Sequence, residues 1–240
     1  MKRQVSASLV AAFASFSNCA ARGASFDCAR ATTVEEQAVC ADPGLSSLDS
    51  LLGQAFAKAK KDSASDQQEM ARVMAVARAF LKQRQACSSA RSCLVASYAG
   101  ALDGYGSAGS NVQIPAWIDA NVISGGRAPD SDVLPKSPGQ CVSTRVAEVH
   151  PRLGGDGPVK SADYDSGTGV EFDNGGHQVS YNREPALMTS YPGDSVVMCL
   201  ISIPQLCPHG DDRGRSYLVT NLRTKKTWTL PDSQHMCGGA

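Results

Sequence analysis

The sequence lacks the short motifs that mark the common enzyme classes. It has no G-x-S-x-G nucleophile motif, no H-E-x-x-H zinc motif and no glycine-rich phosphate loop. No C-x-x-C pair occurs, and the 4 histidines are scattered, whereas zinc ligands usually come as close pairs. These absences favour a binding protein over an enzyme, and we expect neither catalytic residues nor a cofactor.

The chain also lacks an excess of charge of either sign, with 23 basic and 23 acidic residues. A leader of 24 residues would remove Lys2, Arg3 and Arg22 and no acid, which leaves 20 − 23 = −3. Nucleic-acid binding calls for a basic stripe, so we expect no nucleic-acid partner.

Long apolar runs are missing except for a short one at the N-terminus. Lys2 and Arg3 precede VSASLVAAFASFS, and the small residues of NCAARGAS follow it. The run is too short to span a bilayer, and the pattern is that of a secretory signal peptide over residues 1–24. We therefore expect a periplasmic or secreted protein.

Cys19 suggests lipoprotein processing as an alternative to ordinary signal-peptide cleavage, because a bacterial lipoprotein carries a lipidated cysteine directly after such a run. Phe16 and Asn18 depart from the aliphatic and small residues that the lipoprotein signal favours. Lipid anchoring is thus the less favoured prediction, and we expect membrane association only if Cys19 is lipidated.

Composition divides the mature chain into three parts. Residues 25–102 show helical spacing, residues 103–137 carry turn-rich segments such as DGYGSAGS, and residues 138–240 contain short alternating runs. The predicted fold class is α+β: a disulfide-bridged helical-hairpin domain, a linker, and a small antiparallel β barrel or sandwich. We expect the two halves to fold separately and the VQIPAWI segment of the linker to dock on one of them.

The helical half has clear signals for where helices start and stop. Thr33 and Glu36 form a capping box, and Pro43 ends the short helix that follows. Apolar stripes over residues 45–59 and 70–81 flank the turn KKDSASDQQ, and a last helix covers residues 94–102. The strands are predicted within residues 141–149, 169–181, 194–203, 216–222 and 225–230, and the most apolar of them, after YPGD, is expected at the centre.

Eight cysteines remain after the leader, and an even number in an exported chain indicates a disulfide framework. If the two long helices form an antiparallel hairpin, Cys28–Cys93 and Cys40–Cys87 are both centred on its turn. We favour these nested bridges over the local pairs Cys28–Cys40 and Cys87–Cys93. In the second half the spacing does not determine the pairing; Cys199–Cys207 with Cys141–Cys237 is one arrangement.

The same hairpin register places Asp49 near Arg78, with Arg84 less than two turns away. An ion pair across the hairpin is predicted, and two solvated charges are the alternative. In the second half, His209, Asp211, Asp212 and His235 suggest a metal or catalytic cluster, but PHGDDRG is also ordinary loop chemistry. We expect no metal there.

Residues 26–102 resemble the N-terminal domain of the LprI-type lysozyme-inhibitor family. The resemblance is carried by FDCARATTVEEQAVC, LSSLDSLLGQAF and FLKQRQACSSARSCLVASYAGAL. Phe80 stands where the family usually has Trp, and Phe56 where Tyr is common. The second half resembles no family that we can name.

The resemblance implies an exported bacterial protein that binds and inhibits lysozyme or a related peptidoglycan hydrolase. It does not indicate which residues make the inhibitory contact. A periplasmic binding or adaptor module without inhibitory activity is the first alternative, and a cell-wall hydrolase is the second.

Overall fold

The computed structural model describes residues 23–154 and 158–239. Cys19 and most of the predicted signal peptide lie outside the described residues. The helical elements come first: η1 (Cys28–Arg30), α1 (Val34–Ala41), α2 (Pro43–Asp62), α3 (Gln67–Cys87), α4 (Arg91–Ser107) and α5 (Ala120–Ser124). The strands follow, with one short helix among them: β1 (Cys141–Pro151), η2 (Ser161–Ser166), β2 (Thr168–Phe172), β3 (His177–Ser180), β4 (Ser195–Ser202), β5 (Ser216–Asn221) and β6 (Thr227–Pro231).

The helix boundaries follow from capping chemistry. Thr33 and Glu36 form the predicted capping box of α1. Asp42 caps α2 by accepting from the amides of Gly44 (2.8 Å) and Leu45 (3.1 Å), and Pro43 takes the first helical position, where no amide is needed. Within the described residues no helix is both long enough and apolar enough to cross a membrane.

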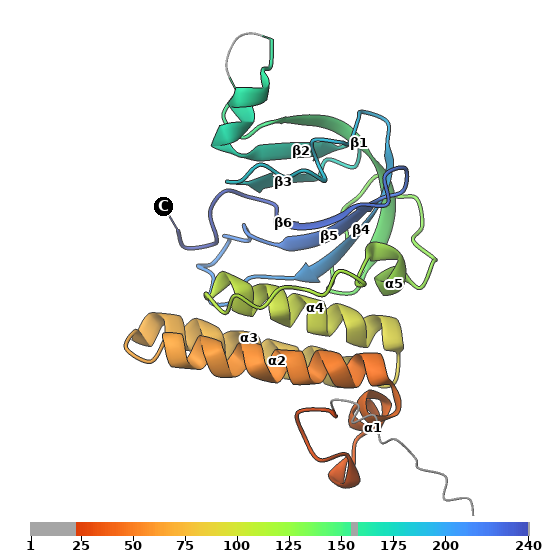
Figure 1. Ribbon diagram of the computed structural model, residues 1–240, viewed down its shortest axis with the longest axis vertical. Coiled ribbons are helices and arrows are strands. Elements are labelled where there is room, and N and C mark those ends of the chain that lie inside the picture. Colours follow the sequence, from red (N-terminus) through yellow and green to blue (C-terminus); the bar gives the residue numbers. More distant parts are fainter. Residues whose placement is uncertain (1–22, 155–157, 240) are drawn as a thin grey trace, which may run out of the picture.

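Helix α4 is the centre of the molecule. It lies between the α2–α3 hairpin and the sheet (Figure 1), and every residue from Leu94 to Leu102 is buried. A helix buried on all sides carries apolar or small residues around its whole circumference. Gly100 marks the closest approach, because a Cβ atom there would lie 2.0 Å from the carbonyl oxygen of Ile201 in β4.

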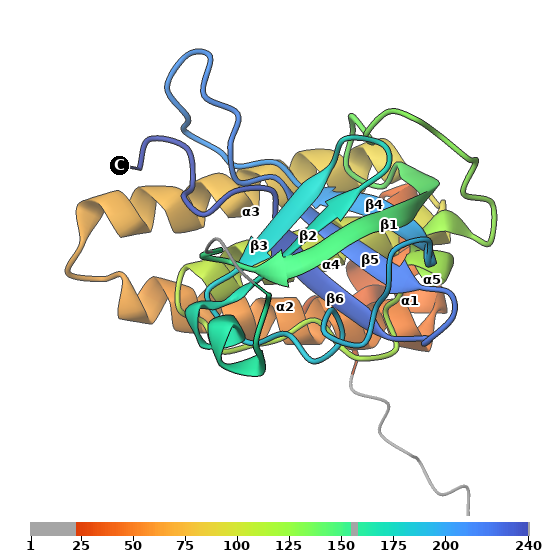
Figure 2. The ribbon, with the colours of Figure 1, turned by 90° about the horizontal axis from the view of Figure 1, so that it is seen from above.

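The strands form one antiparallel sheet in the order β3-β2-β1-β4-β5-β6, which curls into a half-barrel. Seen from above, the strands cross the helix axes obliquely (Figure 2). The predicted α+β class is confirmed. So is the central place of the strand after YPGD, since β4 has β1 on one side and β5 on the other.

Alternate residues of β4 face two different cores. Val197, Cys199 and Ile201 pack with the helices, whereas Met198 and Leu200 point into the half-barrel. The helical core therefore continues onto the outer face of the sheet. Separating the halves would expose this shared apolar surface, although the prediction that each half folds alone stays a prediction.

Helix α4 extends to Ser107, five residues into the segment that composition assigned to the linker. Burial of Tyr105, whose ring lies 5.7 Å from that of Phe56, outweighs the glycines that predicted a turn. The VQIPAWI segment docks on the helical core as expected, through Val112, Ile114 and Ile118, although Trp117 is 44% exposed. Beyond it, the amide of Ala120 donates to the Thr220 hydroxyl (2.9 Å).

The eight cysteines within the described residues are all bridged, but the favoured nested pairing is wrong. The bonds are the local ones, Cys28–Cys40 and Cys87–Cys93. The nested pairing requires the segment before Pro43 to continue along the axis of α2. Instead the chain turns at Asp42, so α1 and η1 fold back on each other beyond the end of the hairpin (Figure 1).

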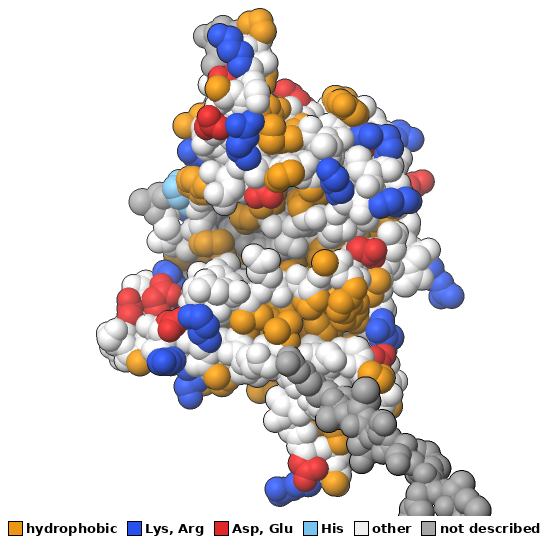
Figure 3. Space-filling view, viewed as in Figure 1, with side chains coloured by type: hydrophobic (Ala, Val, Ile, Leu, Met, Phe, Trp, Pro, Cys, Tyr) orange, Lys and Arg blue, Asp and Glu red, His pale blue; other side chains and the backbone are white. Residues whose placement is uncertain are grey.

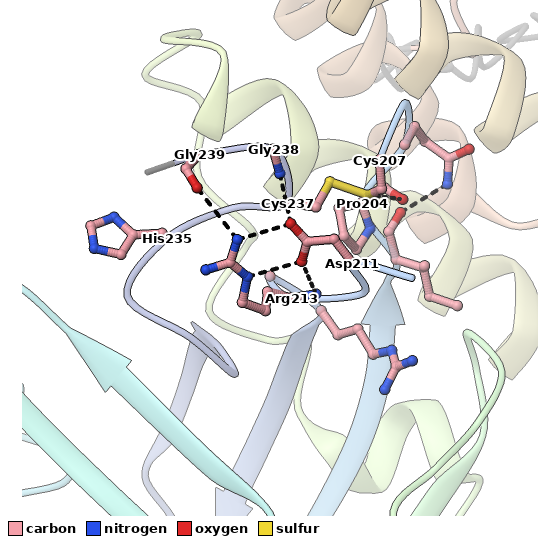
Figure 4. The surroundings of a disulfide bond; sticks show 12 residues. Pro204, Cys207, Asp211, Arg213, His235, Cys237, Gly238 and Gly239 are labelled. Atoms are coloured by element: carbon pink, nitrogen blue, oxygen red, sulfur yellow. Dashed lines mark hydrogen bonds and ion pairs between the residues drawn. A yellow bond between two sulfur atoms is a disulfide. The ribbon is translucent and has the colours of Figure 1, made fainter. Parts of the chain in front are cut away.

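The suggested pairing in the second half is also wrong: the bonds are Cys141–Cys199 and Cys207–Cys237. Cys141 and Cys199 are direct neighbours across β1 and β4, with their Cα atoms 4.1 Å apart. Cys207 lies beyond the end of β4 and holds the C-terminal tail, as Figure 4 shows.

Candidate functional site

The candidate site is a protruding loop of residues 26–41, which we call the disulfide loop. It projects from the helical layer on the side opposite the sheet (Figure 1), and charged side chains gather at its tip (Figure 3). None of the residues of η1 is buried, and Val34 is 54% exposed. Val39 of α1 belongs to the helical core and anchors the base of the disulfide loop, whereas η1 and Val34 are accessible to a partner.

Local hydrogen bonds and the disulfide make the disulfide loop rigid. The Asp27 carboxylate accepts from the amide of Ala29 (3.0 Å), and the Glu36 carboxylate accepts from the amides of Thr32 (3.0 Å) and Thr33 (3.2 Å). The Thr33 and Thr32 amides hold the pKa of Glu36 below its usual range. The Cys28–Cys40 bond closes the loop covalently, so little conformational entropy remains to be lost on binding.

A buried carboxylate fixes the chain that enters the disulfide loop. Asp49 on α2 is 3% exposed and accepts from the amide (2.6 Å) and the hydroxyl (2.5 Å) of Ser25. Its other oxygen accepts from the Tyr98 hydroxyl at 2.8 Å. Burial, and after it the Asp49 charge, raise the pKa of Tyr98 far above its usual range, so this hydroxyl remains a donor.

The predicted ion pair of Asp49 is formed by Arg84, not by Arg78. The Arg84 guanidinium lies 3.7 Å from the Asp49 carboxylate and also packs over the rings of Phe26 and Phe80. Arg78 is exposed, because it lies on the outer side of α3 while Phe80 and Arg84 lie on the inner side. Arg84 thereby connects the disulfide loop to the helical core.

Asp49→Asn should destabilise the protein by about 2–3 kcal/mol, since a buried, charge-assisted network loses its acceptor charge and Arg84 is left without a counter-ion. Urea unfolding of the oxidised chain measures this difference. Tyr98→Phe, which removes only one donor, should cost about 1 kcal/mol. Equal effects of the two substitutions would show that the Asp49 charge is unimportant.

The histidines and aspartates suggested for a metal do not converge. Asp211 accepts from Arg213 Nε (2.9 Å), Arg213 Nη2 (2.9 Å) and the Gly238 amide (2.9 Å), and Arg213 holds its pKa below the usual range. In Figure 4 the Arg213 guanidinium lies between Asp211 and His235, and Asp212 pairs with Arg215. Over residues 23–154 and 158–239, no three His, Cys, Asp or Glu side chains form a metal-binding group.

Sequence reasoning missed Ser25 and Tyr98 as partners of Asp49. The tyrosine was visible as a motif residue, but its contact with Asp49 depends on how α4 packs against α2. No family model matches the chain, and no curated protein or solved structure is significantly similar to it. The resemblance to the LprI-type family thus depends on the motifs of residues 26–102.

Proposed function

We propose that this chain is a non-enzymatic protein of the bacterial envelope that binds and inhibits lysozyme or a related peptidoglycan hydrolase. The observation that carries the proposal is the rigid disulfide loop, whose base is anchored in the helical core by Val39 and whose η1 segment is exposed and carries charged residues. Four disulfides are typical of proteins that fold in an oxidising compartment, where such hydrolases act.

Arg30 at the tip of the disulfide loop is the residue that we assign to the inhibitory contact. It is exposed and closes the short η1 helix. Glycosidases work through a pair of carboxyl groups that flank the scissile bond, and a guanidinium matches a carboxylate with two parallel hydrogen bonds. A rigid loop that exposes an arginine can therefore block the cleft and neutralise the catalytic charge at once.

Arg30→Ala is expected to weaken inhibition of lysozyme about 30-fold or more, because removing one partner of a desolvated charge pair costs at least about 2 kcal/mol. The measurement is the inhibition constant in a cell-wall lysis assay with the oxidised full-length chain. Stability should not change, since the exposed Arg30 side chain makes no hydrogen bond or ion pair within the described residues.

Arg72→Ala is the matched control, because Arg72 is also an exposed helical arginine and pairs only with its neighbour Glu69. This variant should inhibit as the unaltered chain does. If the wild type inhibits and Arg30→Ala inhibits equally well, the contact lies elsewhere. If the wild type itself fails, the adaptor function without inhibition becomes the better account.

A further inference from the structure

Within the described residues, side-chain hydrogen bonds and not a backbone ladder close the curled sheet between its edge strands β3 and β6, and Gln178 makes most of them. Gln178 on β3 is 1% exposed and donates to the carbonyl oxygens of Tyr217 (2.9 Å) and Leu230 (2.8 Å) across the gap between β3 and β6. It also accepts from Trp228 Nε1 at 2.9 Å. We call this gap the seam of the half-barrel.

A pocket of about 190 Å³ opens beside the seam. It is lined by apolar and polar groups from five parts of the chain, namely Leu134, Gly175, Gly176, His177, Met198, Arg215, Tyr217 and Asp232. His177 is exposed at its rim, whereas Met198 belongs to the inner core of the half-barrel. The pocket thus runs from solvent to the core.

Tyr217 is the unusual member of this pocket. The residue is 1% exposed, yet its hydroxyl group has no well-formed hydrogen bond to any residue that the structure describes. Buried hydroxyl groups are normally paired, because an unpaired one loses its hydration without compensation. Burial raises the pKa of Tyr217, the Asp232 charge raises it further and the neighbouring Arg215 guanidinium lowers it; the net effect is a raised pKa, so the hydroxyl remains protonated.

The pocket lining contains one basic and one acidic side chain, Arg215 and Asp232. Arg215 pairs with Asp212 at the rim, and Asp232 accepts from the amides of Gly214 (2.7 Å) and Arg215 (3.0 Å) through one oxygen. Both of these bonds go to Oδ1 of Asp232, and within the described residues its Oδ2 accepts none. An anion would meet Asp232 and a cation would meet Arg215, so the pocket suits a neutral ligand that both donates and accepts.

We propose that this pocket binds a neutral, polyhydroxylated ligand of the size of one sugar ring. The Tyr217 hydroxyl and the free oxygen of Asp232 would hydrogen-bond its hydroxyl groups, and Leu134 and Met198 would contact its apolar face. Such sites commonly combine apolar walls with a few convergent polar groups. The proposal is independent of lysozyme binding, which we assign to the opposite end of the molecule.

The test is ligand-observed NMR of the full-length oxidised chain with N-acetylglucosamine, glucuronate and glucosamine, which share a ring and differ in charge. The neutral sugar should bind best. Tyr217→Phe should weaken its binding about 3- to 10-fold, the value of one hydrogen bond, while leaving the melting temperature equal or higher because no internal bond is lost.

Tyr191→Phe is the matched control, because Tyr191 is 63% exposed and lies over Arg223, outside the pocket. It should bind the sugar as the wild type does. The proposal is overturned if none of the three probes binds, if a charged probe binds best, or if Tyr217→Phe keeps full affinity. A lower melting temperature of Tyr217→Phe would also overturn it, since the hydroxyl would then have an internal partner.

Discussion

Gly100→Ala is expected to destabilise the protein by about 3 kcal/mol, although alanine is the better helix former by about 1 kcal/mol. The added methyl group would lie 2.0 Å from the carbonyl oxygen of Ile201 and 2.9 Å from its carbon, and both atoms belong to the backbone of the central strand. Neither can move without shifting α4 away from β4. Thermal or urea unfolding of the oxidised chain measures the effect.

Gly106→Ala in the same helix is the control. There the nearest atom to a new Cβ, the Val112 carbonyl oxygen, is 3.8 Å away, so the substitution meets no obstacle. We expect it to stabilise by about 0.5–1 kcal/mol through helix propensity alone. If both substitutions stabilise the chain, α4 does not pack closely on β4 and the shared core is disproved.

Gln178→Glu should destabilise by about 4 kcal/mol or more at pH 7. The substitution places a carboxylate oxygen against the carbonyl oxygens of Tyr217 and Leu230, where the glutamine had two N–H donors. Burial raises the pKa of a carboxyl group, and a protonated acid can donate one bond. The loss should therefore be smaller at about pH 4 than at pH 7, because stability from a raised pKa is lost as pH rises.

Gln205→Glu provides the matched comparison, since Gln205 is exposed and its amide makes one bond to the nearby Ile203 carbonyl. This variant should be neutral within about 0.5 kcal/mol. A similar small effect of Gln178→Glu would mean that water, and not the side chain of Gln178, satisfies the seam.

Local chemistry made the helices and strands predictable. The capping box at Thr33, the proline at position 43 and the DNGG turn between β2 and β3 each act over a few residues, and all three are where the sequence predicted them. The disulfide pairing was not predictable, because it depends on the direction of the chain before Pro43 and on strand order. Cys141 and Cys199 are 58 residues apart in sequence and become neighbours only through the sheet.

The sequence contains one sign of the core that the helices share with the sheet, but the turn-rich composition after residue 102 favoured a linker there. LVASYAGAL in α4 is apolar or small on every face, which is typical of a helix covered on all sides. Tyr105 and the glycines after it were assigned to a linker because turn residues are frequent there. Asp49 pairs with Arg84 and not with Arg78 because Arg84 lies on the inner face of α3. Which face of α3 is the inner one depends on where α4 packs against it.

The exposed disulfide loop is likewise visible only in three dimensions. Cys28 and Cys40 were expected to tie the hairpin through Cys93 and Cys87, but they bond to each other and close a loop beyond the end of the hairpin. Asp49 explains how the loop is held in place, since this buried carboxylate of the LSSLD sequence accepts a hydrogen bond from Ser25, just before the loop. The motif therefore has a clear structural role in positioning the loop.

The central claim, inhibition of lysozyme, is tested most directly by titrating the oxidised full-length chain into lysozyme and following cell-wall lysis. We predict that activity falls in proportion to the added chain and approaches zero near one equivalent. The same chain with its disulfides reduced and alkylated should inhibit far less. Unchanged lysis with oxidised chain at about tenfold excess, over lysozymes of several types, would contradict the account.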